Sequence, residues 1–311
     1  MDVRRLRLLL ELSRLGSMHE VAAELGLSTS AVSAQLAALA REVGTPLLEP
    51  DGRRVRLTPA GRRLADHAVT ILAAVDAARL DLDPGADPAG TVRVGGFATA
   101  MVRSLLPVVQ ELASTHPAVR VLLHEYEPLE AFDLLAHDDL DLALVYDYDL
   151  SPLAPTLDLV VRPLWSAPWG VAVRVDGQGD GPIDLATLAD STWIVNSRHT
   201  ADEEALRTLA SLAGFTPRVE HRIDSLDLVA ELVAGGAGSA LLPLGRDFAG
   251  VRVREVAGQG TRLRAYAVAR RGRDAWPPLR LLLDRLAHPV TDTLADTLAD
   301  QVERHEPARD D

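Results

Sequence analysis

The chain has 311 residues, enough for two or three domains, carries a formal net charge of −13 and contains no cysteine. The lack of cysteine excludes disulfides, thiolate metal sites and cysteine catalysis. The charge is uneven, because residues 1–66 hold ten arginines and eight acidic residues, a balance of +2 that leaves −15 for the rest, so an N-terminal part that binds nucleic acid is compatible with an acidic protein.

Residues 1–17 begin basic and continue apolar, as a secretory signal does. Glu11 and Arg14 interrupt the apolar run, and no small-residue cleavage site follows it, so we interpret this segment as the first helix of a domain. No stretch of the sequence reaches the ~20 apolar residues needed to span a membrane. We therefore expect a cytoplasmic protein that makes no membrane contact.

Residues 17–43 predict two helices joined by a tight turn. Ser17 and Glu20 have the spacing of a capping box, which predicts a helix from Met18 that ends at Gly26. Ser28 is then the predicted cap of a second helix. The apolar residues that recur at helical spacing along that second helix are Val32, Leu36, Leu39 and Val43.

The opposite face of the second predicted helix is short, polar and nearly free of acid. Hydroxyl side chains of this size can reach base edges and phosphates in a DNA major groove, and alanines allow close approach. An ordinary amphipathic helical hairpin with a solvated outer face is the alternative. The residues on this face are Thr29, Ser30, Ser33, Ala34, Ala37 and Arg41.

A short hairpin is predicted next, with apolar stretches at residues 46–49 and 55–57 on either side of Asp51-Gly52. Arginines at positions 53, 54 and 56 follow the turn. A hairpin of this kind after two helices is typical of a wing that grips phosphates or enters the minor groove. The hairpin therefore favours DNA binding over the solvated alternative.

Residues 16–61, GSMHEVAAELGLSTSAVSAQLAALAREVGTPLLEPDGRRVRLTPAG, resemble the winged helix-turn-helix of LysR-type transcriptional regulators. The family pattern includes S-x-x-A-[LV]-S in the recognition helix and L-T-x-A-G after the wing, and both are present. The resemblance implies that the wing contributes Arg53 and Arg54. It also implies that the recognition helix contacts DNA through Ser28, Thr29, Ser30, Ser33 and Ala34.

Four positions depart from the family pattern. Thr29 stands where glutamine is common, and Ala34 stands where a basic residue usually follows the second serine. Ala40 replaces the usual acidic residue, and Pro50 the usual arginine. Because Ala34 lacks a guanidinium that would contact phosphate or guanine, we expect binding to depend more on the wing and the preferred site to differ from that of relatives.

Thr58 and Pro59 predict a cap and first-turn proline for a helix that runs to about residue 82. This helix is longer than the small domain needs, so its apolar stripe packs either on its own domain or against a partner's copy. We favour the partner, and the resemblance implies the same dimerising role. Residues 83–90 predict a hinge. The stripe comprises Leu64, Ala68, Ile71, Leu72, Val75 and Ala78.

After Gly90 strands alternate with helices, which predicts a parallel α/β sheet. The first unit has strands at residues 91–95, 119–124 and 140–146 and helices at residues 99–115 and 129–136. The second has strands at residues 157–165, 169–173, 193–196, 218–223, 239–242 and 262–269, and helices that begin at residues 184, 201, 225 and 277.

Residues 91–289 resemble the two-lobed effector domain of the same family, which has the type 2 periplasmic-binding-protein fold. The predicted fold class is therefore α/β with an N-terminal winged helix-turn-helix at residues 1–58 and a linker helix with hinge at residues 59–90. The resemblance implies a lobe 1 of about residues 91–163 and 266–289 and a lobe 2 of about residues 164–265. A polar tail, residues 290–311, is expected to be flexible.

Ligands of open α/β sheets bind beyond the carboxyl ends of strands, which selects particular loops between the lobes. A carboxylate ligand with Arg198 or His199 as counter-charge fits these loops. A basic ligand held by Asp147 and Asp224 fits equally, and an empty cleft is a third alternative. The candidate effector-binding residues are Phe97, Ala98, Thr99, Ala100, Tyr146, Asn196, Arg198, His199 and Ser225.

No H-E-x-x-H, G-x-S-x-G or phosphate-loop motif is present in the sequence, so we expect no catalysis, no metal and no cofactor. The predicted function is that of a LysR-type regulator that binds double-stranded DNA as a homodimer or homotetramer. A small-molecule effector controls it, and RNA polymerase is a further candidate partner. A solute-binding or catalytic α/β protein with an accessory helical domain is the alternative, and a structural DNA binder is a weaker one.

Overall fold

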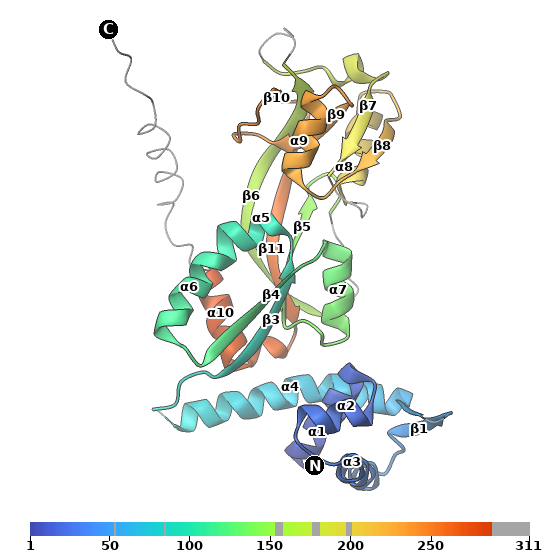
Figure 1. Ribbon diagram of the computed structural model, residues 1–311, viewed down its shortest axis with the longest axis vertical. Helices are drawn as coiled ribbons and strands as arrows, with labels where there is room; N and C mark the ends of the chain where they lie inside the picture. Colours follow the sequence, from blue (N-terminus) through green and yellow to red (C-terminus); the bar gives the residue numbers. More distant parts are fainter. Residues whose placement is uncertain (53, 84, 153–157, 176–180, 197–200, 288–311) are drawn as a thin grey trace.

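The structure, a computed structural model, describes residues 1–52, 54–83, 85–152, 158–175, 181–196 and 201–287. Figure 1 shows a helical head at one end, a long helix beside it and an elongated α/β domain of two parts. The predicted fold class is confirmed in these parts. The predicted tail lies outside the described residues.

The head consists of three helices, α1 (Val3–Leu15), α2 (Met18–Glu24) and α3 (Thr29–Val43), around a common apolar core. Helix α2 begins at Met18 as predicted, but the Ser17 side chain makes no capping hydrogen bond, so the predicted capping box is wrong. The core side chains from these helices include Leu6, Leu9, Val21, Val32, Leu36 and Leu39.

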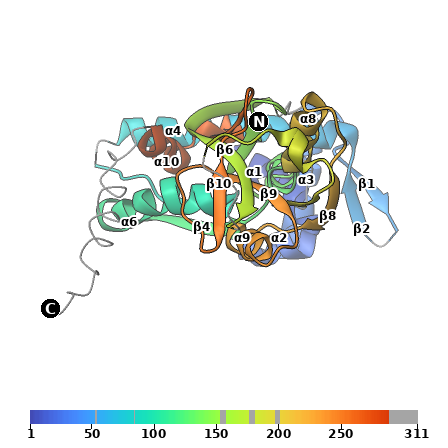
Figure 2. The same cartoon turned by 90° about the horizontal axis from the view of Figure 1, so that it is seen from above.

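The wing is an antiparallel hairpin of β1 (Leu48–Asp51) and β2 (Arg54–Leu57), in which Leu48 pairs with Leu57 and Asp51 with Arg54. Gly52 turns the chain with a φ of 61°, which glycine adopts without steric cost. The predicted hairpin is confirmed, and Figure 2 shows it projecting past the rest of the head. Arg53 lies outside the described residues.

The long helix α4 (Pro59–Leu82) begins as predicted, with the Thr58 hydroxyl accepting a hydrogen bond from the Gly61 amide at 3.0 Å. A side chain at Gly61 would come within 2.2 Å of the Leu47 carbonyl oxygen, so this helix start requires glycine. The residues of the predicted apolar stripe on α4 do not share one environment. Ala68 and Leu72 are buried in the head core, whereas Ala78 is exposed.

Helix α4 also contacts the α/β domain through two elements near the end of the chain, a short 3₁₀ turn (Arg273–Ala275) and α10 (Pro277–Ala287). Arg270 forms an ion pair with Asp66 of α4 at 3.1 Å. A side chain at Gly272 would overlap Thr70 of α4. The head and the α/β domain are therefore joined by direct packing as well as by the chain.

The α/β domain is built on one nine-stranded sheet with the order β4-β3-β5-β11-β6-β9-β7-β8, and β10 pairs with β6. Parallel pairing of β3 with β4 and β5 forms one half, and parallel pairing of β7 with β8 and β9 forms the other. The strands are β3 (Gly90–Gly96), β4 (Val119–Glu125), β5 (Leu142–Tyr148), β6 (Leu159–Arg174), β7 (Thr192–Val195), β8 (Arg218–Arg222), β9 (Ser239–Pro243), β10 (Val251–Arg254) and β11 (Thr261–Arg270).

Two long antiparallel strands, β6 and β11, run through both halves and join them (Figure 1). Helices α6, α7 and α10 surround the half nearer the head, and α8 and α9 surround the other half. The helices are α5 (Ala98–Ala100), α6 (Leu106–Thr115), α7 (Pro128–Ala136), α8 (Ala201–Leu212) and α9 (Leu226–Ala234).

Several predicted elements differ from those observed. Strand β6 is continuous through residues 159–174 where two strands were predicted, because β11 pairs with its first part, up to Trp169, and β9 and β10 pair with the rest. The four-residue β10 was missed, and the helix predicted from Asp184 is only a 3₁₀ turn (Leu185–Leu188). The helix predicted at 99–115 contains a π-helical turn (Met101–Leu105) just before Pro107, which has no amide proton to donate.

A buried ion cluster lies at the end of the sheet nearer the head. Asp141 is 2% exposed and accepts bonds from the Arg93 guanidinium at 2.9 and 3.0 Å and from Arg273 at 2.6 and 3.0 Å. Burial opposes ionisation, but the hydrogen bonds and charges of the two arginines lower the pKa of Asp141 below its usual value. Asp141 therefore ties β3 to the end of β11 and its following turn.

Candidate functional site

Helix α3 lies at the outer end of the head, away from the α/β domain (Figure 1). Its outward side chains are exposed, as the sequence pattern predicted. Ser28 caps the helix by accepting a bond from the Ala31 amide at 3.1 Å, and its hydroxyl lies 3.0 Å from that of Ser30. The exposed residues on the proposed DNA-facing side are Thr29, Ser30, Ser33, Ala34, Ala37 and Arg41.

The acid carried by α3 is Glu42, near the end of the helix, and it is already paired. The N-terminal amine lies 2.6 Å from Glu42, and Arg5 lies 3.2 Å from it. The hydrogen bond from the N-terminus lowers the pKa of Glu42. The exposed face of α3 therefore presents hydroxyls, methyls and a cation, but no unpaired carboxylate.

The wing carries both signs of charge. Arg56 forms an exposed ion pair with Glu49, its cross-strand neighbour, at 2.9 Å. The Arg54 backbone pairs with Asp51, and its side chain lies outside the described part of the structure, as does all of Arg53. With three arginines and two acidic residues over positions 49–56, the wing has a formal charge of +1.

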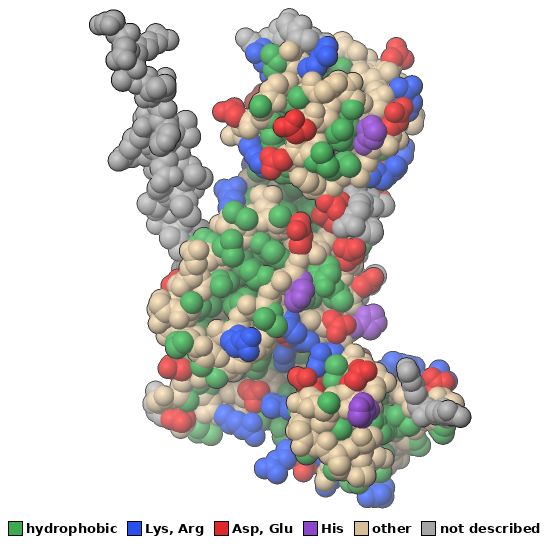
Figure 3. Space-filling view, in the orientation of Figure 1, with side chains coloured by type: hydrophobic (Ala, Val, Ile, Leu, Met, Phe, Trp, Pro, Cys, Tyr) green, Lys and Arg blue, Asp and Glu red, His purple; other side chains and the backbone are tan. Residues whose placement is uncertain are grey.

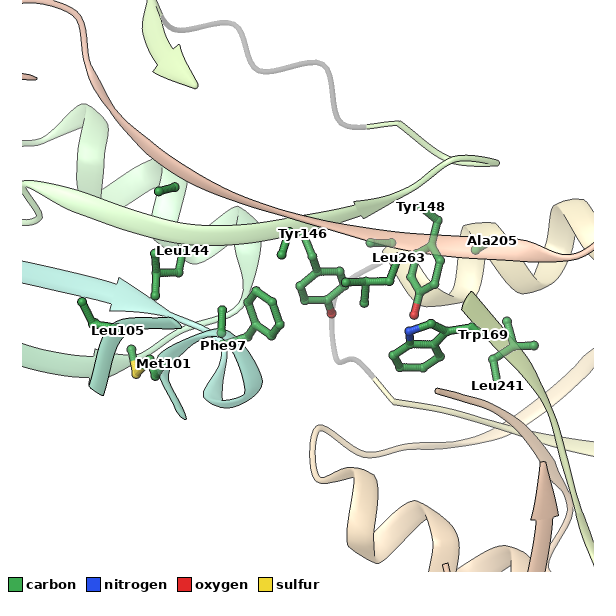
Figure 4. Packing of buried hydrophobic residues seen from close by; sticks show 14 of the residues in the cluster. Phe97, Met101, Leu105, Leu144, Tyr146, Tyr148, Trp169, Ala205, Leu241 and Leu263 are labelled. Atoms are coloured by element: carbon green, nitrogen blue, oxygen red, sulfur yellow. The ribbon is translucent and has the colours of Figure 1, made fainter. Parts of the chain in front are cut away.

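The first predicted effector loop follows β3. Phe97 is buried, and its ring packs edge-on against Tyr146, with 4.8 Å between the ring centroids (Figure 4). The Trp165 ring lies on it edge-on as well, at 6.1 Å between centroids. Ala98 and Thr99 are exposed, whereas Ala100 is buried. The loop thus offers one hydroxyl and one aromatic wall, and the Ala100 side chain belongs to the core, so Ala100 could reach a ligand only through its backbone amide.

Strand β5 places two tyrosines between the halves of the domain. Tyr146 contacts Glu127 and Asp202 through its hydroxyl oxygen, each at 2.8 Å, and the Tyr148 hydroxyl donates to the other oxygen of Asp202. Glu127 precedes α7 on the half near the head, whereas Asp202 is in the first turn of α8 on the other half. The predicted Tyr146 thus lies in a buried polar cluster that spans both halves.

The two carboxyls of this cluster have unusual proton affinities. Burial raises the pKa of Glu127 to about 7, against the lowering effect of the Tyr146 hydrogen bond. Burial also raises the pKa of Asp202 to about 6, against hydrogen bonds from Tyr148 and Tyr146. Burial and the adjacent carboxyls raise the pKa of both tyrosines well above the usual value.

The remaining predicted effector-binding residues have different surroundings. Asn196 is buried, and it partly opposes the rise in the pKa of Tyr148. Ser225 caps α9, accepting from the Leu228 amide at 3.3 Å, which explains the serine without a ligand. Arg198 and His199 lie outside the described residues.

Asp147, the predicted partner for a basic ligand, is engaged elsewhere. It alternates with the tyrosines along β5 and forms two 2.8 Å bonds to Arg264 and one of 3.3 Å from Tyr266. Sequence reasoning instead missed Glu127 and Asp202. The signal that could have found them is position, because both begin helices that follow strands of the sheet.

Within the part of the chain that the structure describes, no group of three histidine or acidic side chains is arranged to hold a metal ion. Among the described helices, none has the length and apolar character needed to cross a bilayer.

Two family models match the chain. The model of the LysR substrate binding domain matches residues 85–289, and that of the bacterial regulatory helix-turn-helix protein, lysR family, matches residues 3–62. Among curated relatives, the transcriptional dual regulator GltC of Bacillus subtilis is 29% identical over 78% of this chain and 81% of its own. The nitrogen assimilation regulatory protein nac of Klebsiella aerogenes is 27% identical over 78% of each.

Solved structures share the fold over nearly the whole chain. A full-length OxyR variant from Pseudomonas aeruginosa aligns with a TM-score of 0.69 at 20% identity, covering 93% of this chain and 96% of that one. Full-length CbnR in complex with its target DNA aligns with a TM-score of 0.51 at 20% identity, covering 92% and 99%.

Proposed function

Because this chain belongs to the LysR family of transcriptional regulators, we propose that it reads a specific DNA sequence with α3, grips the flanking backbone with its wing and responds to a small molecule between its two lobes. The observation that carries this proposal is the exposed face of α3, free of unpaired acid and next to an arginine-bearing wing. Hydroxyls and methyls of this size suit base edges, and arginines suit phosphates.

In this proposal each predicted residue has a role set by its position. Thr29, Ser30, Ser33 and Ala34 face the bases from the N-terminal half of α3. Ser28 lies at the helix N-terminus, where backbone amides favour a phosphate. The backbone contacts of the wing are assigned to Arg53 and Arg54.

Substituting alanine for Ser33 or Arg53 tests this division of roles. Loss of the Arg53 guanidinium should weaken binding to all DNA sequences alike and reduce the slope of log affinity against log salt by about 1, whereas loss of the Ser33 hydroxyl should change site preference by about 1–3 kcal/mol at one base pair. Fluorescence anisotropy over a panel of single-base variants measures both. Equal behaviour of the two variants would show that the groove assignment is wrong.

Removing the acid that pairs with Arg56 should strengthen binding. Glu49→Gln frees Arg56 for phosphate and removes a negative charge from the wing, so affinity should rise about 3- to 10-fold at low salt. The exposed pair contributes little to stability, so the melting temperature should hardly change. Glu220→Gln breaks a similar exposed pair with Arg218 far from the head and should leave DNA affinity unaltered. No gain from Glu49→Gln would place this pair away from the DNA.

We further propose self-association as a homodimer or homotetramer, through two apolar surfaces. Leu82, at the end of α4, is 85% exposed. Figure 3 shows hydrophobic side chains gathered over the lobe that carries α6, where Val102 and Leu122 are exposed. Paired heads suit the two half-sites of a symmetric operator. Sedimentation of the full chain, with an Leu82→Glu variant, tests this assignment.

The effector site we propose lies beside Phe97 and Tyr146, with Thr99 as a hydroxyl donor and Asn196 on the facing lobe. Arg198 and His199, which lie outside the described residues, are the candidate counter-charges for an acidic ligand. Binding of a small metabolite should raise the melting temperature, and Thr99→Ala should abolish that rise while the exposed Thr45→Ala does not. Cytoplasmic location, contact with RNA polymerase and the lack of catalytic activity complete the proposal. DNA as the partner and relatives that are regulators support these three points.

A further inference from the structure

Three oxygen–oxygen contacts link the two lobes through β5. The Tyr146 hydroxyl oxygen lies 2.8 Å from Glu127 Oε2 and 2.8 Å from Asp202 Oδ2, and the Tyr148 hydroxyl contacts Asp202 Oδ1. Glu127 belongs to the lobe near the head and Asp202 to the other lobe. Figure 4 shows the tyrosine rings standing side by side on the strand, with Phe97 and Trp169 beyond them. The contacts therefore form a chain from one lobe to the other.

The number of protons in this chain can be counted. Each oxygen–oxygen contact at hydrogen-bond distance requires one proton, so three contacts require three. The tyrosines supply two, because each hydroxyl has a single proton. An ionised carboxylate only accepts, so the third proton must be held by Glu127 or Asp202. With both carboxylates ionised, one contact becomes an unscreened approach of two oxygen lone pairs inside a buried site.

We propose that the proton shared by Glu127, Tyr146 and Asp202 is a latch that holds the two lobes together, so that the lobe arrangement of this regulator responds to pH. This inference rests on the proposed two-lobe response, to which it adds a proton as a signal. Protonated, the chain of hydrogen bonds is complete and the lobes stay in the observed arrangement. Deprotonated, two buried negative charges face each other across Tyr146, and the lobes separate about β6 and β11.

Charged and polar groups that surround the latch contribute to its sensitivity to pH. Asp224, before α9, and Glu130, on α7, add negative charge that raises the proton affinity of Glu127. Asp224 acts in the same way on Asp202, whereas Asn196 partly opposes the rise in the pKa of Tyr148. Arg264 on β11 is held by Asp147 on the other face of β5. Because Arg198 and His199 lie outside the described residues, the test includes variants that remove their charge.

The direction of the pH effect follows from burial. Burial raises the pKa of Glu127 from 4.5 to about 7 and that of Asp202 from 3.8 to about 6. Both groups therefore bind protons more tightly folded than unfolded. Their stabilising contribution is complete below the unfolded values and is lost as pH rises through the folded ones. The latch is closed on the acidic side of neutrality and opens as pH passes through 6 to 7.

The experiment measures the distance between the lobes of the full chain, without DNA or added ligand. The natural chain has no cysteine, so spin labels can be attached through Asp133→Cys on α7 and Ser211→Cys on α8, both exposed. Distance distributions from pulsed electron spin resonance are recorded from pH 5.5 to 8. We expect the distance to lengthen with a midpoint between pH 6 and 7. A distance that stays constant across this range overturns the proposal.

Three variants assign the transition to the latch. Glu127→Gln replaces the protonated acid by a neutral amide that still donates, so the short distance should persist at every pH. Tyr146→Phe removes the bridging hydroxyl and should give the long distance at every pH. Glu130→Gln should keep the transition with a lower midpoint, because its carboxylate raises the proton affinity of Glu127. Arg198→Gln and His199→Gln should keep the transition as well. A transition that survives in Glu127→Gln, or vanishes in His199→Gln, rejects the assignment. Specific DNA binding is measured in a separate experiment. Failure of the latch proposal can therefore be distinguished from failure of the proposed function.

Discussion

Replacing Asp141 with asparagine is expected to lower the free energy of unfolding by about 3–5 kcal/mol. Asp141 is buried against two guanidinium groups, those of Arg93 and Arg273, at 2.6–3.0 Å. Asparagine removes the charge and leaves two cations facing each other around a neutral group. The penalty is large because the partners lose their counter-charge in a site shielded from water, not because the ion pair itself was strongly stabilising.

Denaturant unfolding of the full chain, followed by circular dichroism, measures this effect. Asp133→Asn, on the exposed face of α7, is a matched control and should change stability by less than about 0.5 kcal/mol. The dependence of the unfolding free energy on acidic pH provides a second check. The pKa of Asp141 is lowered, so its contribution is present above the unfolded value of 3.8 and is lost as pH falls below it. The Asp141→Asn variant should lack the part of the pH dependence of stability that comes from protonation of Asp141. An unfolding free energy unchanged by Asp141→Asn would contradict the buried cluster.

Placing a carboxylate on the outward face of α3 is expected to abolish DNA binding. Ala34→Glu should weaken binding more than about 100-fold, because like charges brought together at an interface cost several kcal/mol. Position 34 is exposed and glutamate is a good helix former, so the fold should survive. Ala34→Arg should act in the opposite direction, with a gain of about 10-fold, since one more phosphate or guanine contact becomes available.

Comparing the two opposite substitutions gives a decisive test of whether the outward face of α3 contacts DNA. Ser211→Glu, on the exposed side of α8 in the lobe farther from the head, introduces the same charge there and should leave binding unchanged. Anisotropy titrations at two salt concentrations, with melting temperatures for each variant, separate a loss of affinity from a loss of folding. Similar affinities for Ala34→Glu and Ala34→Arg would show that α3 does not enter the groove.

The head was predictable from sequence because its signals are local. Ser28, Thr58 and Pro59 fixed helix starts, and the repeat of Val32, Leu36 and Leu39 fixed the buried side of α3. The capping box at Ser17 failed because the same residue spacing occurs whether or not the hydroxyl turns toward the helix. Local spacing therefore predicted element type well and side-chain hydrogen bonding poorly.

The polar cluster between the lobes was predicted only in outline, because it depends on contacts between distant segments. The rule that ligands bind after strands selected Tyr146, which lies in the buried polar cluster, but not the acids that Tyr146 contacts. Glu127 and Asp202 are separated by 75 positions and meet only because β5 runs between two lobes. Asp147 shows the same limit, since its partner Arg264 lies on a strand that returns much later in the chain.

The account depends most on the claim that the full chain recognises a particular DNA sequence rather than DNA in general. A gel-shift with DNA from the region upstream of its own coding sequence, titrated with salt and with bulk competitor, tests this directly. We predict that the complex persists in competitor, with an affinity at least about 1,000-fold higher than that for bulk DNA at physiological salt. Equal displacement by bulk DNA and by the unlabelled upstream fragment would contradict the claim.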